Sequence, residues 1–214
     1  MKKIILLVGI LINITAFASP VEHPLYAGIS AGYGVADWNS LANHDSNPDN
    51  ASSVLEGVPD KAADRGLDYG AFIGYTFTPN YALELSYRKF KTVQIYFTED
   101  STYTPPASPN SYPDIRSTTF NFSLVNKIML PLPDNFSLFS GLGPSLTYQS
   151  NPISKRTQQA GATFAVGANY EITEHFMATL EGDYTTGWGK SEEQPVNHYV
   201  PFLYSGDFKL AYRF

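Results

Sequence analysis

Eight charged residues occur at alternate positions inside segments that are otherwise apolar and aromatic. They are Glu84, Arg88, Lys127, Glu171, Glu181, Asp183, Lys209 and Arg213. Successive side chains of a β-strand point to opposite faces, so these charges would lie on the faces opposite the apolar residues. Because buried charges are tolerated only when they are paired and hydrogen-bonded, we expect them to form a network of ion pairs. The same groups, if hydrated, could instead line a conduit for ions.

A second group of oxygen-bearing side chains has the spacing of a calcium-binding loop. Asp45, Asn47, Asp49 and Glu56 stand at the first, third, fifth and twelfth positions of the EF-hand pattern. The sixth position is Asn50 instead of the usual Gly, and no helical pattern flanks the segment. We therefore interpret it as a polar surface loop and expect neither a metal site nor a cofactor.

The four histidines do not form a recognisable catalytic group. They are His23, His44, His175 and His198. Only His44 lies in a His-x-Ser-Asn sequence, at 44–47, and that segment overlaps the one interpreted above as a polar surface loop. Nucleophilic catalysis needs a base held against a nucleophile, and the sequence alone does not show that His44 is held in this way. A lipid A-modifying enzyme would need such a histidine near the membrane surface. The sequence therefore favours a non-enzymatic protein.

The last ten residues indicate the kind of element that carries the charges. Phe208, Leu210, Tyr212 and Phe214 alternate with a charged face that includes Lys209 and Arg213. A transmembrane strand of about ten residues, apolar toward lipid and polar toward a lumen, has this pattern. The segment 205–214 is therefore predicted to be a membrane-spanning strand.

The N-terminus predicts export. Lys2 and Lys3 precede the short apolar run 4–12, and Ala16 and Ala18 supply the small residues of a cleavage site. We expect a signal peptide over 1–18 and one domain over 19–214. The chain contains no cysteine, so no disulfide would stabilise that domain. Without Lys2 and Lys3, twelve basic residues stand against twenty acidic ones, a balance that excludes a nucleic-acid partner.

Eight alternating segments can be found along the chain, arranged as four hairpins. They cover 25–35, 69–77, 81–88, 120–128, 136–148, 164–172, 176–184 and 205–214. Short turns at 78–80, 130–135 and 173–175 alternate with long polar loops at about 36–67, 91–116, 149–160 and 187–204. Short turns on one side and long loops on the other are typical of outer-membrane barrels, so we predict an eight-stranded antiparallel up-and-down transmembrane β-barrel.

The chain resembles the OmpA-like family of eight-stranded outer-membrane barrels. The resemblance is strongest in 75–87 (YTFTPNYALELSY), in 168–181 (ANYEITEHFMATLE) and in 210–214 (LAYRF). It implies the barrel domain alone, without a peptidoglycan-binding domain, and a C-terminal assembly signal formed by Phe208, Leu210, Tyr212 and Phe214. In that family an acid meets an Arg as a gate. Glu84 matches the acid and Lys127 a neighbouring Lys, but Thr179 replaces the gate Arg.

Together these features predict a protein of the Gram-negative outer membrane with a structural or surface-binding, adhesin-like role. The loops 36–67 and 91–116 would carry that role, since the second contains Tyr96, Phe97, Tyr103 and Tyr112 among prolines. Expected partners are outer-membrane lipid, lipopolysaccharide, the assembly machinery and an unidentified surface ligand. A small, narrow, porin-like pore is the main alternative, and a lipid A-modifying enzyme is a further one.

Overall fold

A computed structural model describes residues 21–37, 59–62, 64–97, 115–150, 157–187 and 201–214. The predicted signal peptide and the segment 45–56, whose spacing resembles a calcium-binding loop, lie outside these residues. No helix in the described segments is long and apolar enough to cross a membrane.

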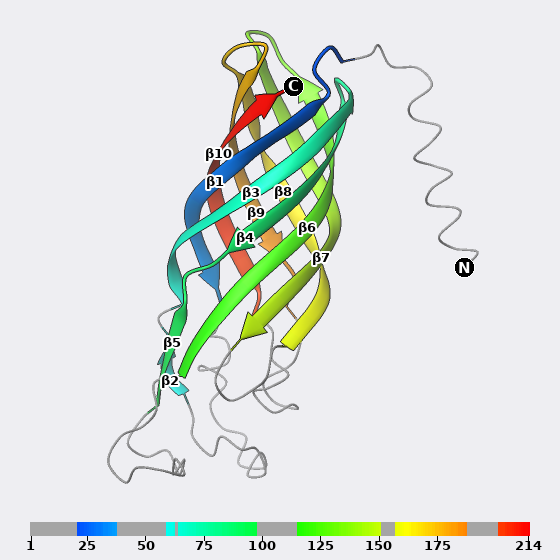
Figure 1. The fold of residues 1–214 in the computed structure, drawn as a ribbon. Coiled ribbons are helices and arrows are strands. Elements are labelled where there is room, and N and C mark those ends of the chain that lie inside the picture. Colours follow the sequence, from blue (N-terminus) through cyan, green and yellow to red (C-terminus); the bar gives the residue numbers. More distant parts are fainter. Residues whose placement is uncertain (1–20, 38–58, 63, 98–114, 151–156, 188–200) are drawn as a thin grey trace, which may run out of the picture.

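The described segments fold into strands. Their bounds are β1 Leu25–Ala36, β2 Pro59–Ala62, β3 Arg65–Thr78, β4 Tyr81–Lys89, β5 Val93–Phe97, β6 Ile115–Pro131, β7 Phe136–Ser150, β8 Thr157–Glu171, β9 Phe176–Thr185 and β10 Leu203–Arg213. All of them except β2 and β5 form one ring, in the order β1-β3-β4-β6-β7-β8-β9-β10, in which every neighbouring pair is antiparallel. The predicted eight-stranded barrel is confirmed (Figure 1).

The barrel closes where its first and last strands meet. β1 pairs with β10 from Tyr26 opposite Arg213 to Ala36 opposite Leu203. Closure leaves no unpaired strand edge within the ring, which the interior of a membrane requires. The two strands approach closely at Gly28, where a Cβ atom would lie 2.1 Å from the carbonyl oxygen of Leu210.

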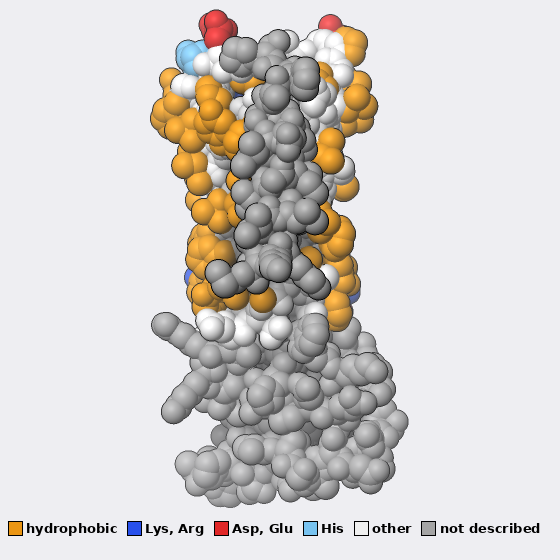
Figure 2. Space-filling model, turned by 90° about the vertical axis from the view of Figure 1, so that its right-hand side faces the viewer, with side chains coloured by type: hydrophobic (Ala, Val, Ile, Leu, Met, Phe, Trp, Pro, Cys, Tyr) orange, Lys and Arg blue, Asp and Glu red, His pale blue; other side chains and the backbone are white. Residues whose placement is uncertain are grey.

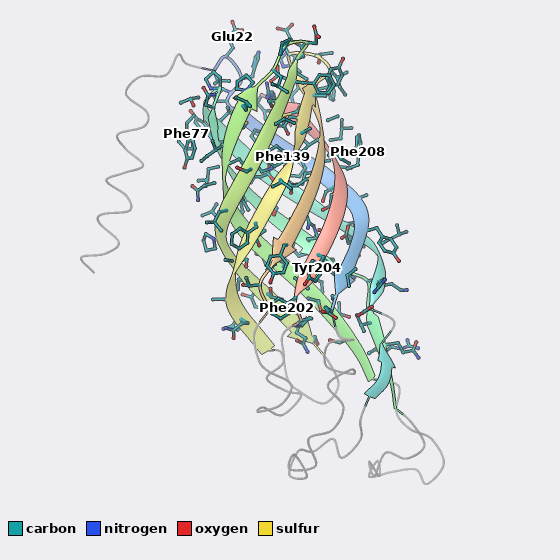
Figure 3. The ribbon with its side chains drawn as sticks, turned by 180° about the vertical axis from the view of Figure 1, so that it is seen from behind. Glu22, Phe77, Phe139, Phe202, Tyr204 and Phe208 are labelled. Carbon is teal, nitrogen blue, oxygen red and sulfur yellow. The ribbon has the colours of Figure 1, made fainter. Side chains whose placement is uncertain are left out.

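The two faces of the wall differ as the alternation predicts. Ile29, Leu180 and Phe208 point outward and are 68%, 67% and 57% exposed. Hydrophobic side chains cover the visible outer wall in Figure 2, and Phe208 projects from the wall in Figure 3. Many inward-facing positions instead hold buried Ser, Thr, Asn and charged residues, and others hold buried aromatic and apolar side chains such as Phe72 and Phe139.

Short turns connect the strands at the end that carries both termini of the barrel. Asp134 and Asn135 join β6 to β7 with φ values of 62° and 63°, a left-handed conformation that Asp and Asn tolerate. The Thr173 hydroxyl accepts hydrogen bonds from the backbone N–H groups of His175 and Phe176 before β9 begins. These findings confirm the short turns, and we call this the turn end and the opposite one the loop end.

At the loop end the wall extends further than predicted. β5 pairs with the start of β6, and β2 pairs with β5, although both short strands fall in segments expected to be loops. β6 also begins at Ile115, five residues before the predicted start. A strand must be apolar on one face only where it contacts lipid. Strands that pair beyond the lipid-facing band therefore show a weaker apolar–polar alternation in the sequence, which is why these were not predicted.

Candidate functional site: the charged lumen

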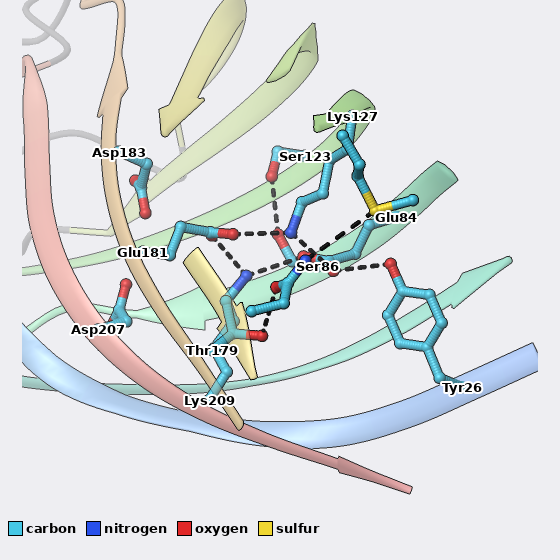
Figure 4. Close-up of polar contacts among 12 residues, drawn as sticks. Tyr26, Glu84, Ser86, Ser123, Lys127, Thr179, Glu181, Asp183, Asp207 and Lys209 are labelled. Carbon is cyan, nitrogen blue, oxygen red and sulfur yellow. Dashed lines mark hydrogen bonds and ion pairs between the residues drawn. The ribbon is translucent and has the colours of Figure 1, made fainter. Parts of the chain in front are cut away.

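Four charged side chains meet in the middle of the barrel. The Lys127 ammonium lies 2.8 Å from Glu84 Oε2 and 2.7 Å from Glu181 Oε2. The Lys209 ammonium lies 2.8 Å from Glu84 Oε1 and also contacts Glu181 Oε1. Each base therefore bridges both acids, and we call this group the central ring (Figure 4).

The topology places the central ring across the whole lumen. In the ring of strands β4 lies opposite β9, and β6 lies opposite β10. Glu84 therefore faces Glu181, and Lys127 faces Lys209. An eight-stranded barrel is just wide enough for side chains to fill it, so four side chains from opposing walls can close its cross-section.

Aromatic residues hold the central ring in position. The Lys127 ammonium lies 4.4 Å from the centre of the Phe139 ring, and that of Lys209 lies 5.0 Å from the centre of Phe72. The Tyr26 hydroxyl donates a hydrogen bond of 3.0 Å to Glu84 Oε2. Toward the turn end, Tyr26 and Phe72 pack with Met177 and Ala211 as a buried apolar cluster.

A second charged group, the outer cluster, lies toward the loop end and consists of Arg88, Asp183, Asp207, Asp68 and Ser205. The Arg88 guanidinium is 2.6 Å from Asp207 Oδ2, contacts Asp183 Oδ2 and Ser205 Oγ, and is 3.8 Å from Glu181. Ser205 donates to both Asp183 and Asp207. Arg88 thus links the outer cluster to the central ring.

The outer cluster carries more acid than base. Gly32 of β1 is in register with Asp207 on one side and with Asp68 on the other. The Asp207 carboxyl group lies over Gly32 and that of Asp68 lies over Gly34, so each occupies space that a side chain on β1 would fill. Both oxygens of Asp68 and Oδ1 of Asp207 have no hydrogen-bond partner among the described residues. In this cluster three carboxyl groups face one base, Arg88.

The structure brings together six of the eight charged residues that the sequence singled out: Glu84, Arg88, Lys127, Glu181, Asp183 and Lys209. Glu171 and Arg213 instead form their own pair of 2.7 Å at the turn end, where the Glu171 side chain is 43% exposed. Thr179, which the resemblance places where a gate Arg is expected, donates to Asn169 Oδ1 at 2.8 Å. Glu84 instead pairs with two lysines, Lys127 and Lys209.

Sequence reasoning missed Tyr26, Asp68 and Asp207 as members of the site. Asp207 has the same parity as Lys209, so the alternation of the last strand could have identified it. Asp68 precedes the predicted start of its strand by one residue. Tyr26 is an aromatic residue at an inward position, where the pattern predicts a small or polar one.

The other predicted site residues lie away from the lumen or outside the residues that the structure describes. His23 and His175 are at the turn end with ring centres 4.6 Å apart, and His175 Nδ1 lies 3.1 Å from the Arg213 carbonyl oxygen. His44, His198 and the calcium quartet fall outside the described residues. Within the described part, no group of three or more His, Cys, Asp or Glu is placed to hold a metal ion. Phe208, Leu210, Tyr212 and Phe214 are exposed on the outer wall, and their role in assembly stays a prediction.

An apolar outer wall, a polar buried lumen and alternating turns and loops define an integral β-barrel membrane protein. A family model described as "Outer membrane protein beta-barrel domain" matches residues 4–200. The chain therefore belongs to this family, and it is a protein of the bacterial outer membrane. Among curated proteins, none matches its sequence.

Solved structures with the same fold include several small outer-membrane barrels. Neisserial surface protein A aligns at 13% identity and a TM-score of 0.54, covering 89% of this chain and 97% of that one. OprG of Pseudomonas aeruginosa aligns at 14% identity and a TM-score of 0.52, covering 92% and 99%. The N-terminal barrel of OprF from the same organism aligns at 15% identity and a TM-score of 0.50, covering 90% and 98%.

A double-mutant cycle tests whether the central ring acts as a unit. Lys127→Met leaves two buried carboxylates with one base between them, so the free energy of unfolding should fall by about 3–5 kcal/mol. Glu84→Gln should also destabilise the barrel. If the two residues interact, the free energy of unfolding of the double variant should fall by less than the sum of the two single decreases, with a difference of at least about 1 kcal/mol. Urea unfolding in lipid vesicles, followed by circular dichroism, measures all three, and additive losses would contradict the ring.

The excess acid in the outer cluster predicts opposite effects for two similar substitutions. Asp68→Asn removes one of the three carboxyl groups that face a single base, so the free energy of unfolding should rise by about 1 kcal/mol. Asp183→Asn removes a carboxylate bound by Arg88 and should lower it by about 2 kcal/mol. The same unfolding measurement compares them, and destabilisation by Asp68→Asn would show that this carboxylate is already compensated.

Proposed function

We propose that this protein is a non-enzymatic component of the outer membrane that binds a surface ligand through its outer loops, with the barrel as a rigid anchor. The observation that carries the proposal is the central ring. Glu84, Lys127, Glu181 and Lys209 are each no more than 5% exposed and reach one another from opposite walls. A barrel filled in this way cannot pass other molecules through its lumen, so it meets them on its outer surface and at its two ends.

The loop end is the better candidate for such contacts. At the turn end, β3 and β4 are joined by two residues and β6 and β7 by four, which leaves little chain for recognition. At the loop end, β2 and β5 extend the wall beside β6, and long connections join these strands. The aromatic and proline residues of 91–116 belong to this region, and exposed aromatics often dominate binding surfaces.

The positions of the described histidines support a non-enzymatic role. His23 and His175 lie at the turn end and contact each other and the backbone. An enzyme that modified outer-leaflet lipid would need its base at the loop end, near that lipid's head group. Neither described histidine is placed for this reaction.

A narrow pore is the second candidate, and one observation favours it. Asp68 and Asp207 have buried oxygens that lack hydrogen-bond partners among the described residues, as expected of groups that water solvates. A hydrated chamber above the central ring could form one part of a conduit. Conduction would still require the four side chains of the central ring to separate.

The proposed function is tested by shortening individual loops on the cell surface. The protein would be produced in a non-adherent Gram-negative host, and binding to cultured epithelial cells and immobilised matrix proteins measured. Replacing 98–114 or 38–58 with a short Gly-Ser linker should abolish the binding that the parent barrel confers. The same replacement of 188–200 is the control and should preserve it, with heat-modifiable gel mobility verifying folded barrel in every case. Absence of binding by the parent, or its survival in both loop variants, would refute the proposal.

A further inference from the structure

A groove of about 660 Å³ lies on the outside of the wall near the loop end, across β4, β6 and β7. Its lining includes Tyr87, Lys89, Thr118, Phe120, Phe122 and Tyr148. These side chains occupy the outward positions of their strands, and Lys89 and Phe120 are directly opposite each other in the β4–β6 register. Seven of the eight lining residues face outward, so the groove opens toward the surroundings of the barrel, and the inward-facing Gln149 borders it from the lumen side.

The floor of the groove is aromatic. The Tyr87 ring stacks on Phe120 with centres 6.2 Å apart, and its centre lies 5.0 Å from that of Phe122. Phe122 in turn contacts Tyr148 edge-on at 5.9 Å. Packed rings of this kind form a fixed apolar surface, against which a hydrocarbon chain can lie without reorganising the wall.

The rim of the groove is polar and cationic. The Lys89 ammonium lies 5.6 Å from the centre of Tyr69 and 5.8 Å from that of Phe120, so it is held over the wall at the level of the aromatic residues. The Thr118 hydroxyl lies beside it and is 3.2 Å from that of Thr92. Aromatic residues gather at the depth where lipid head groups begin, so the Lys89 charge lies at head-group level.

The exposed charges of the described wall differ between its two ends. Arg65 and Arg116 lie further toward the loop end on β3 and β6, and both are exposed. At the turn end, Glu22, Asp134 and Glu174 are exposed. Figure 2 shows basic side chains at the lower margin of the apolar wall and acidic ones at its upper end. The described wall residues near the loop end are thus complementary to a membrane leaflet whose head groups are anionic.

We propose that this groove binds a phosphorylated, acylated glycolipid of the outer leaflet. One acyl chain lies against Tyr87, Phe120 and Phe122, and a phosphate group accepts hydrogen bonds from Lys89. A phosphate paired with an ammonium forms a charge-assisted hydrogen bond, which is stronger than a neutral one. The site is independent of the ligand proposed for the outer loops, because it lies on the wall itself.

The test uses bisphosphorylated lipid A as the probe, with the same lipid after enzymatic removal of its phosphates for comparison. Binding to the refolded barrel in neutral detergent micelles is measured by native mass spectrometry. Lys89→Gln should weaken binding of the phosphorylated lipid about tenfold and leave binding of the dephosphorylated lipid unchanged. Phe122→Ala should weaken binding of both lipids, because it removes part of the apolar floor.

Lys91→Gln is the matched control, since it removes the same charge two residues away. The Lys91 ammonium donates to the Arg65 carbonyl oxygen at 3.1 Å, and its side chain lies against Gly66 instead of the groove. This variant should bind both lipids as the parent does, with circular dichroism verifying the fold of each protein. Equal losses for Lys89→Gln and Lys91→Gln, or equal binding of the two lipids by the parent, would overturn the proposal.

Discussion

The structure depends on the narrowness of an eight-stranded lumen. Charges that point into such a space cannot remain hydrated individually, so each must find an opposite charge across the barrel. Glu84 and Glu181 face each other and are bridged by Lys127 and Lys209. Closure of β1 on β10 brings Lys209 into this arrangement. Backbone pairing and the central ring therefore support each other. The closed wall positions the charged side chains, and the paired side chains fill the lumen that the wall encloses.

A filled lumen leaves the outer surface and the two ends as the places where this protein meets other molecules. The turn end is compact and the loop end is extended by β2 and β5. The outer cluster shows that charge balance is less complete toward the loop end, where Arg88 faces Asp68, Asp183 and Asp207. On the outside, the described basic residues near the loop end would suit the anionic lipid proposed for the groove. Membership of the outer-membrane barrel family agrees with an outer wall that contacts lipid and two ends that face water. The fold alone, however, does not define a ligand.

The sequence predicted the architecture well because lipid imposes a simple rule on every strand. Ile29, Leu180 and Phe208 had to be apolar, and their parity placed Glu84, Lys127 and Lys209 inside. The same rule could not identify β2 and β5, since no lipid constrains their side chains. Asp68 was missed because its strand begins earlier than the apolar pattern. The alternation also could not predict which charges pair, because pairing depends on the strand register across the barrel. Glu171 and Arg213 share the inward parity, but they pair with each other at the turn end and not with the central ring.

Conductance of the refolded barrel in a planar lipid bilayer tests most directly whether the central ring closes the lumen. Protein whose folding has been verified by heat-modifiable gel mobility should produce no discrete current steps above those of protein-free membranes. Reproducible steps whose size changes when Glu84 is replaced by Gln would contradict the account, because the charges would then line an open path.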